Sequence, residues 1–397
     1  MSEQNKEYRI IHKTIQQPID HTDPNSKEFP QRIWILFPDD AKSDSPVFFH
    51  LGEEQKLDDD KVIILYDSYG KRNDIIYIQV EHRGYGHSIT NESDQSKPSY
   101  VKIDQVLADY HKAVQKLKME YNGPWIGAGY SYGGGLVINY AAEYPQDVNV
   151  ILSSSGVIDW PFMMSEYDNQ MKINFGEELY SLLSDHIHNL EPNEMFDENW
   201  IEREFIIACL HGIAQKEEFK RFQKALTKMT RGTTDELLAQ LHKIDDNFAD
   251  NQAMNYALSN AKKTLTKEEA RSGKYSWRVW RYQQCYETGV FEVSENSDGL
   301  FTRSRDDFIN EGIALFGEEP PMAKGQKWFP RKMVKNLKIP LIYVNGGMDP
   351  WSGLCLEPGY EIEKGCYFYY PNARHCPEKD KLKRGKEVIN SILRVLD

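Results

Sequence analysis

Residues 124–137 contain the feature that most constrains the fold of this chain. An apolar run from Pro124 to Ala128 leads into Gly129-Tyr130-Ser131-Tyr132-Gly133, and a helical pattern rich in small residues follows. G-x-S-x-G between a strand and a helix is the spacing of a nucleophile elbow, a tight turn that exposes the serine. The N–H groups of the new helix would face a developing oxyanion. The alternative is a plain strand–turn–helix with a buried serine, because G-x-S-x-G also recurs by chance.

Short apolar runs alternate with helical patterns around this stretch. Strands are expected at residues 32–37, 47–51, 74–80, 148–155, 340–345 and 366–370, and helices at 100–121 and 381–396. Such alternation predicts a mostly parallel sheet covered on both faces. From about residue 160 to 335 the pattern changes to helices, expected at 177–190, 200–213, 217–229 and 234–265. The sequence therefore predicts an α/β-hydrolase core in two parts, residues 1–159 and 336–397, interrupted by a helical cap over 160–335.

Composition limits the classes of partner. A length of 397 residues fits one large domain with an insertion, and 40% hydrophobic residues suffice for its core. The net charge of −13 argues against nucleic acid or an anionic membrane as the main partner. The five cysteines show no C-x-x-C spacing, so no zinc site is expected, and no cofactor is implied.

The first residues give only a slight indication of compartment. Residues 1–6 are polar, and no apolar run of the sequence is long enough to span a bilayer. Either the protein is cytoplasmic, which we slightly favour at this stage, or the numbering starts after a removed leader.

Two later loops carry the partners that an elbow serine needs. Asp349 follows the expected strand at 340–345, and His375 follows the next one, at 366–370. Both therefore lie past the carboxyl ends of consecutive strands, at the edge that carries Ser131, and they follow it in the order of this fold. A loop aspartate or histidine alone is often structural, but together they predict a triad. In it His375 takes the Ser131 proton and Asp349 orients the imidazole.

An oxyanion hole requires two backbone donors. We expect the N–H of Tyr132 and a second donor from Gly52-Glu53, in the loop after residues 47–51. Glu53 and Glu54 are unusual beside a developing negative charge. They either point away on a solvated loop face, the more common case, or hold a substrate's amino group.

The loop after residues 74–80 contains Glu81-His82-Arg83. A buried pair between Glu81 and Arg83 that braces this loop is a better interpretation than catalysis by His82. The position of His82 in chain order is not that of the base.

Further motifs carry a family resemblance. They are Gln17-Pro-Ile-Asp-His21 with Gln31-Arg32, Glu81-His-Arg-Gly-Tyr-Gly-His-Ser88, Gly129-Tyr-Ser-Tyr-Gly-Gly134, Trp280-Arg-Tyr-Gln-Gln-Cys-Tyr-Glu287, Asn345-Gly-Gly-Met-Asp-Pro-Trp-Ser-Gly353 and His375-Cys376. The chain resembles the serine peptidases that include lysosomal Pro-Xaa carboxypeptidase, dipeptidyl peptidase II and thymus-specific serine protease. This resemblance implies Ser131, Asp349 and His375 as the triad, a helical cap, and exopeptidase cleavage after proline or another small residue.

Some positions depart from that family. Gly52-Glu-Glu-Gln replaces a Gly-Asn-Glu-Gly type sequence, and Tyr130 stands where the family usually has glycine before the nucleophile. The chain is also shorter and poorer in cysteine than typical members, which are mostly secreted or lysosomal. The bacterial prolyl di- and tripeptidyl aminopeptidases are similar as well, through Asp109-Tyr-His-Lys, Trp125-Ile and residues 144–149. They tend to carry lysine where this chain has Tyr132.

The resemblance also implies substrate-binding residues. Trp351 and the signature residues Trp280, Tyr282 and Gln283 would wall a proline pocket, although these side chains equally suit packing of cap against core. An aminopeptidase needs a carboxylate for the substrate's amino group, with Glu53, Glu54 and Glu287 as candidates. A carboxypeptidase needs a cation for the terminal carboxylate, with Arg281 or Arg374 available.

The sequence thus predicts a serine exopeptidase acting on short, proline-containing peptides, with its direction undecided. The alternatives are a carboxylic-ester hydrolase with the same triad and a silent binding protein on a hydrolase fold. The cap lacks a long apolar stretch for lipid, and the intact triad argues against a silent protein. The oligomeric state does not follow from these residues.

Overall fold

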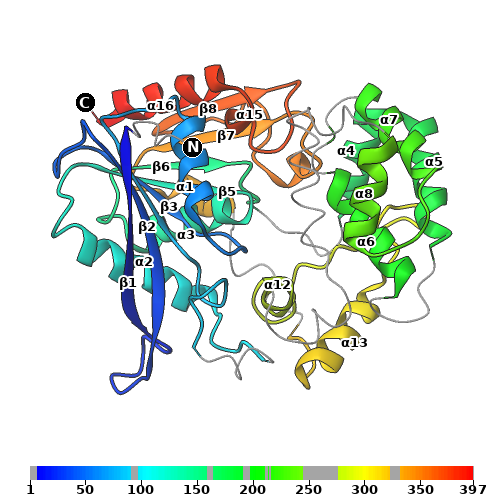
Figure 1. Ribbon diagram of the computed structural model, residues 1–397, viewed down its shortest axis with the longest axis horizontal. Helices are drawn as coiled ribbons and strands as arrows, with labels where there is room; N and C mark the ends of the chain where they lie inside the picture. Colours follow the sequence, from blue (N-terminus) through cyan, green and yellow to red (C-terminus); the bar gives the residue numbers. More distant parts are fainter. Residues whose placement is uncertain are drawn as a thin grey trace.

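A computed structural model describes residues 7–90, 97–158, 164–190, 197–210, 213, 216–244, 276–321 and 331–396 (Figure 1). Its sheet has the order β1-β2-β4-β3-β5-β6-β7-β8. The strands are β1 (Tyr8–Pro18), β2 (Glu28–Pro38), β3 (Val47–Leu51), β4 (Ile76–Val80), β5 (Trp125–Tyr130), β6 (Val150–Ser154), β7 (Leu341–Gly346) and β8 (Gly365–Tyr370). The pairs β1–β2 and β2–β4 are antiparallel, and all other neighbours are parallel. The fold is that of an α/β hydrolase, as predicted.

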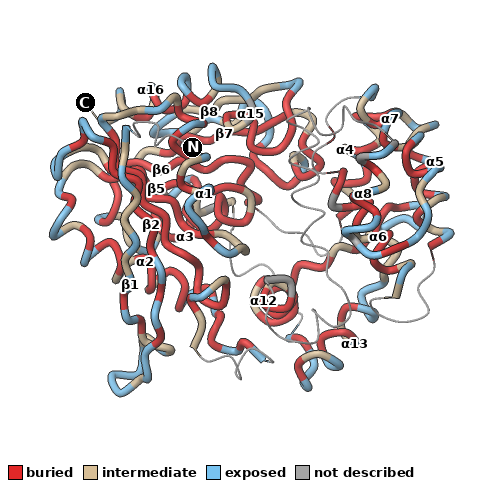
Figure 2. Tube along the Cα trace, viewed as in Figure 1, coloured by how far each residue is buried: buried red, intermediate tan, exposed pale blue. Residues whose placement is uncertain are grey.

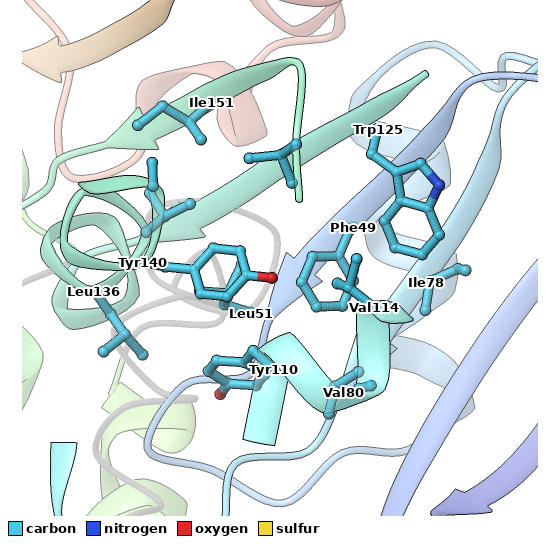
Figure 3. Close-up of a cluster of buried hydrophobic side chains, with 14 of the residues drawn as sticks. Phe49, Leu51, Ile78, Val80, Tyr110, Val114, Trp125, Leu136, Tyr140 and Ile151 are labelled. Carbon is cyan, nitrogen blue, oxygen red and sulfur yellow. The ribbon is translucent and has the colours of Figure 1, made fainter. Parts of the chain in front are cut away.

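Helices cover both faces of this sheet because alternate side chains of the buried strands point to opposite sides. On β3, Val47, Phe49 and Leu51 join a cluster with α2 (Ile103–Leu117) and α3 (Tyr132–Glu143). Phe48 joins the opposite cluster, with α1 (Asp59–Ser68) and α16 (Leu382–Leu396). Figure 3 shows Phe49 of the first cluster, whose side chain is 0% exposed. Its truncation to alanine would cost about 3–5 kcal/mol.

The strand β1 was not among the expected runs. It pairs along its whole length with β2, from Tyr8 opposite Pro38 to Pro18 opposite Glu28. Its side chains are mostly exposed or half-buried, as Figure 2 shows for this edge of the sheet. An edge strand of this kind lacks the continuous apolar run by which the buried strands were recognised.

A helical lobe lies between β6 and β7 in the chain and beside the sheet in space (Figure 1). It contains α4 (Ser165–Phe175), α5 (Glu177–His188), α6 (Glu198–Leu210), α7 (Lys216–Leu226) and α8 (Thr234–Ile244). These helices share one buried cluster with Trp351 and Leu354 of the β7 loop. In α7, Phe219, Phe222 and Leu226 recur at helical spacing and are buried. Of the helix expected at 234–265, the part beyond residue 244 lies outside the described residues.

The chain returns to the sheet through α12 (Ser276–Gln283), a π-helical turn at Gln284–Thr288, α13 (Arg305–Phe316) and α14 (Arg331–Lys335). The cap boundaries at residues 160 and 335 stay a prediction. Within the described part of the chain, no helix is long and apolar enough to cross a membrane.

Candidate active site

Ser131 occupies a strained turn between β5 and α3. Its backbone has φ 53° and ψ −122°, a region that residues other than glycine rarely adopt. A Cβ on Gly129 would lie 1.9 Å from the carbonyl oxygen of Gly133, and one on Gly134 would lie 2.6 Å from Cα of Gly156. The glycines of the G-x-S-x-G-G stretch are therefore required by close backbone approach, as expected for an elbow.

The structure brings Asp349 and His375 together. Nδ1 of His375 lies 2.7 Å from Oδ2 of Asp349, and the two residues are 3% and 0% exposed. The other carboxylate oxygen, Oδ1, accepts the backbone N–H of Trp351 at 2.9 Å. A carboxylate fixed in this way favours the imidazole tautomer with its proton on Nδ1, which leaves Nε2 to accept a proton.

The end of β6 connects the loops of the site through consecutive serines. Ser153 Oγ donates to the carbonyl of Gly134 at 2.9 Å, and Ser154 Oγ donates to Oε2 of Glu378 at 2.8 Å. Ser155 Oγ accepts the N–H of Cys376, the residue after His375, at 2.9 Å. Sequence reasoning took this stretch only as a buried strand. The signal for its role was a run of serines at the carboxyl end of a strand next to the elbow.

The expected oxyanion loop lies against the first turn of α3. A Cβ on Gly52 would meet the carbonyl of Val80 at 2.2 Å, and one on Gly133 would lie 3.1 Å from Cγ of Glu53. The loop therefore passes close to the elbow, with Tyr132 as the first residue of the helix. The half-buried Glu54 follows in the same loop.

The carboxylate of Glu53 is held in place by neutral donors. Gln79 Nε2 lies 3.0 Å from Nδ1 of His50, so this nitrogen accepts and the Nε2–H of His50 donates to Oε1 of Glu53 at 3.2 Å. Gln55 donates to Oε2 of Glu53 at 3.1 Å. Burial lowers the pKa of His50, which keeps this imidazole neutral.

The loop at residues 81–88 is braced differently from the expectation. Arg83 pairs with Asp109 of α2, through Nε and Nη2 at 2.6 Å each, and not with Glu81. Glu81 instead accepts the N–H of Leu57 at 2.9 Å and the hydroxyl of Ser88 at 2.7 Å. The planar guanidinium fits a bidentate carboxylate on a facing helix. Glu81 thereby ties this loop to the oxyanion loop.

His82 is unsuited to act as a base. Its Nδ1 lies 2.6 Å from the carbonyl of Arg83, and its Nε2 lies 3.3 Å from the hydroxyl of Tyr132. Burial lowers its pKa to about 4.

Two of the residues predicted to bind substrate reach the elbow from α12. Gln283 Nε2 donates to the hydroxyl of Tyr132 at 3.1 Å, while its Oε1 accepts the hydroxyl of Tyr85 at 2.6 Å. The ring of Trp280 is edge-on to the ring of Tyr132, with centroids 5.2 Å apart. The signature helix thus sits directly beside the residue that follows Ser131.

The other predicted substrate-binding residues have structural partners. Tyr282 stacks on Tyr286 at 4.7 Å, and Oε2 of Glu287 accepts the N–H of Ile103 at 3.1 Å, at the start of α2. Arg281 Nε lies 2.7 Å from Oε1 of Glu311.

Trp351 follows Asp349 by two residues, and Arg374 directly precedes His375. The ring of Trp351 lies 4.8 Å from the ring of Tyr167 in α4. Arg374, beside His375, is 6% exposed. Neither position by itself assigns a contact with substrate.

The described residues contain no group of His, Cys, Asp and Glu side chains arranged to hold a metal ion. All five cysteines lie in the described part of the chain, and all are free thiols.

The profile of the serine carboxypeptidase S28 family matches residues 17–180 and 214–380. The chain belongs to this family. Membership makes it a serine-type peptidase, and the match covers the elbow, both loops and the α12 signature. The residue roles drawn from the sequence remain proposals.

Several relatives are similar over different lengths. A probable serine protease from Arabidopsis thaliana is 22% identical, over 93% of this chain and 82% of its own. The lysosomal Pro-X carboxypeptidase of Bos taurus is 24% identical, over 85% and 77%. The prolyl tri/tetrapeptidyl aminopeptidase of Streptomyces mobaraensis is 30% identical, over 36% and 28%. The slight lean toward a cytoplasmic location finds no support among these relatives.

Solved structures are similar to this chain at low sequence identity. The proline iminopeptidase of Mycobacterium smegmatis is 12% identical, over 96% of this chain and 98% of its own, with a TM-score of 0.46. The peroxisomal hydrolase Lpx1 of Saccharomyces cerevisiae is 10% identical, over 98% and 91%, with a TM-score of 0.47.

Proposed function

We propose that this serine peptidase is an exopeptidase that cleaves short peptides on the carboxyl side of proline, or of a small residue. Ser131 is the nucleophile, His375 the base and Asp349 the orienting acid. The observation that carries the proposal is the 2.7 Å contact between Asp349 and His375. The end of β6 connects this pair to the strained Ser131 turn, because Ser131 N–H donates to the carbonyl of Ser154 and Cys376 N–H donates to Ser155. The relatives named as prolyl or Pro-X peptidases support the preference for proline.

The chemistry follows from these positions. Ser131 Oγ attacks the carbonyl carbon of the scissile bond while Nε2 of His375 takes its proton, and the oxyanion is held by backbone N–H groups of Tyr132 and Glu53. His375 then gives the proton to the leaving amine, and the acyl-enzyme forms. Water, deprotonated by His375, releases the acid and restores Ser131. Activity therefore needs neutral His375 and should fall toward acidic pH.

The charged candidates differ in how far they suit the recognition of a peptide terminus. Arg281 is 3% exposed and forms an ion pair with Glu311. Glu287 accepts the backbone N–H of Ile103 at the start of α2. Glu53 lies against the elbow helix with Glu54 next to it, and Arg374 lies next to His375, so candidates remain for each end of a substrate. The names of the relatives include both directions of cleavage. Direction is therefore a question for experiment.

Mass-spectrometric digestion of matched peptides tests the proposal. One peptide has proline second from the amino end and one has it second from the carboxyl end. Each is compared with an alanine-for-proline version and with a version whose terminus is acetylated or amidated. Release of an amino-terminal Xaa-Pro dipeptide that acetylation blocks identifies an aminopeptidase. Release of one carboxyl-terminal residue that amidation blocks identifies a carboxypeptidase.

Ser131→Ala is the control for a contaminating peptidase. It should retain only a small residual turnover. Hydrolysis of an ester with no cleavage of either peptide would overturn the proposal in favour of a carboxylic-ester hydrolase. Rapid digestion of a folded protein would contradict the restriction to short peptides.

A further inference from the structure

Tyr130, which precedes the nucleophile, is buried below the elbow. It is 1% exposed, and its hydroxyl lies 2.7 Å from the hydroxyl of Tyr69, at the end of α1. The proposed function assigns no role to this phenol.

The hydroxyl of Tyr69 also donates a hydrogen bond to a buried carboxylate, that of Glu378. It lies 3.4 Å from Oε1 of Glu378, whose Oε2 accepts Ser154 at 2.8 Å. Glu378 is 0% exposed. Burial raises the pKa of Tyr69 and of Tyr130 well above the ordinary value, so both phenols stay protonated. Because Tyr69 gives its one proton to Glu378, its oxygen accepts the proton of Tyr130.

Glu378 lies on the short helix α15 (Pro377–Asp380), which begins two residues after His375. The next residue, Lys379, places its ammonium 3.1 Å from the centroid of the Tyr130 ring. The contact of Lys379, and the contact of Glu378 through Tyr69, join α15 to β5, which ends at Tyr130, the residue before Ser131.

The same phenol also contacts the third part of the site. The ring of His50 lies 5.0 Å from the ring of Tyr130, and His50 donates to Glu53 of the oxyanion loop at 3.2 Å. Tyr130 is therefore in contact with elements that hold the nucleophile, the base and the oxyanion loop.

We infer that Tyr130, Tyr69 and Glu378 are positioning residues, and that their hydrogen-bond chain sets the distance between Ser131 and His375. The inference rests on the proposed roles of those two residues. A displacement of about 1 Å between reacting groups costs on the order of a hundredfold in rate. Loss of this hydrogen-bond chain should therefore lower turnover without changing substrate affinity, because all three side chains are buried.

The test uses Tyr130→Phe, Tyr69→Phe, their double variant, and Glu378→Gln beside Glu378→Ala. Tyr140→Phe is the matched control, because its buried hydroxyl also bonds a buried carboxylate, Asp147, at 2.6 Å. Each protein is assayed well below its unfolding temperature for kcat, KM and the rate of labelling by a fluorophosphonate.

We expect Tyr130→Phe and Tyr69→Phe to lower kcat and the labelling rate about tenfold to a hundredfold, with KM within about twofold. The kcat of the double variant should be no lower than that of the poorer single variant, because each single substitution already breaks the same hydrogen-bond chain. Glu378→Gln, which keeps an acceptor, should retain more activity than Glu378→Ala. Tyr140→Phe should lose stability but keep kcat.

Three outcomes overturn the inference. In the first, the wild type is active and both phenylalanine variants keep its kcat but lose stability as Tyr140→Phe does. The hydrogen-bond chain then has a structural role only. Additive losses in the double variant would also contradict a single chain. A wild type that neither labels nor cleaves any peptide would refute the proposed function itself, and the inference with it.

Discussion

Gln283 of α12 donates a hydrogen bond of 3.1 Å to the phenol of Tyr132, the residue after Ser131. The same amide accepts the hydroxyl of Tyr85, from the loop that follows β4, at 2.6 Å. One buried amide, 0% exposed, thus joins the signature helix to the elbow and to a core loop. The sequence predicts Gln283 as part of the wall of the substrate pocket, and the structure shows that it also contacts the elbow through Tyr132.

Gln283→Leu should destabilise the protein and lower activity. The change removes the amide partner of two buried phenols, at a cost of about 1–3 kcal/mol each. Urea denaturation gives the loss, and steady-state kinetics gives the effect on kcat. Gln284→Leu is the control, because this neighbouring glutamine is also buried, and its side-chain oxygen Oε1 has no hydrogen-bond partner in the described part of the chain. Equal losses in both variants would contradict the assigned role.

Asp349→Asn should lower kcat by roughly 10³–10⁴ while the protein stays folded. The amide cannot hold the proton on Nδ1 of His375, so Nε2 no longer accepts the serine proton. Fluorophosphonate labelling should slow in parallel, which separates the chemical step from substrate binding.

A second histidine–aspartate pair provides the control. Nδ1 of His111 lies 2.7 Å from Oδ2 of Asp147, the same distance as in the His375–Asp349 pair. Asp147→Asn should lower the free energy of unfolding and leave kcat unchanged. An Asp349→Asn enzyme with wild-type turnover would exclude Asp349 as the orienting acid.

Much of the candidate site could be predicted because the order of the strands decides which loops lie next to each other at one edge of the sheet. Asp349 and His375 follow consecutive parallel strands, so their loops must meet at one edge, and the structure places them 2.7 Å apart. The buried strands could be predicted because each contains a continuous apolar run. The exposed edge strand β1 has no such run and was missed.

Pairings between distant elements could not be predicted. Arg83 stands two residues from Glu81, which made that pair the obvious expectation, yet its partner Asp109 lies on α2. Arg281 stands in the signature but faces Glu311 of α13. Periodicity gives the face on which a side chain lies, but not what covers that face.

Arg281→Met should lower stability rather than raise KM. Arg281 and Arg303 share the buried carboxylate of Glu311, and both guanidinium groups pack on the ring of Phe308, at 4.7 and 4.0 Å. Breaking one partner of a buried ion pair costs about 3–5 kcal/mol. Urea denaturation with parallel kinetics distinguishes the two roles. A raised KM for peptides with a free carboxyl end, at unchanged stability, would instead make Arg281 a substrate residue.

The contribution of Glu292 to stability should fall as the pH rises from about 4.5 to 7. Burial, followed by the nearby charge of Glu204, raises the pKa of Glu292 to about 7, although Arg281 and Arg303 oppose the shift. An unfolded glutamate has a pKa of about 4.3. In this window the folded protein holds a proton that the unfolded chain has released, so the free energy of unfolding decreases with pH.

Glu292→Gln should therefore unfold at a higher urea concentration than the wild type at pH 8. We expect its free energy of unfolding to exceed that of the wild type by about 1–3 kcal/mol at pH 8 and to equal it near pH 4.5. The exposed Glu295 of the same loop provides the matched substitution, Glu295→Gln, which controls for the loss of one carboxylate from this loop. A constant offset between wild type and Glu292→Gln at all pH values would mean that Glu292 titrates alike in both states. Glu292 would then be an ordinary ionised carboxylate in the folded protein, balanced by Arg281 and Arg303.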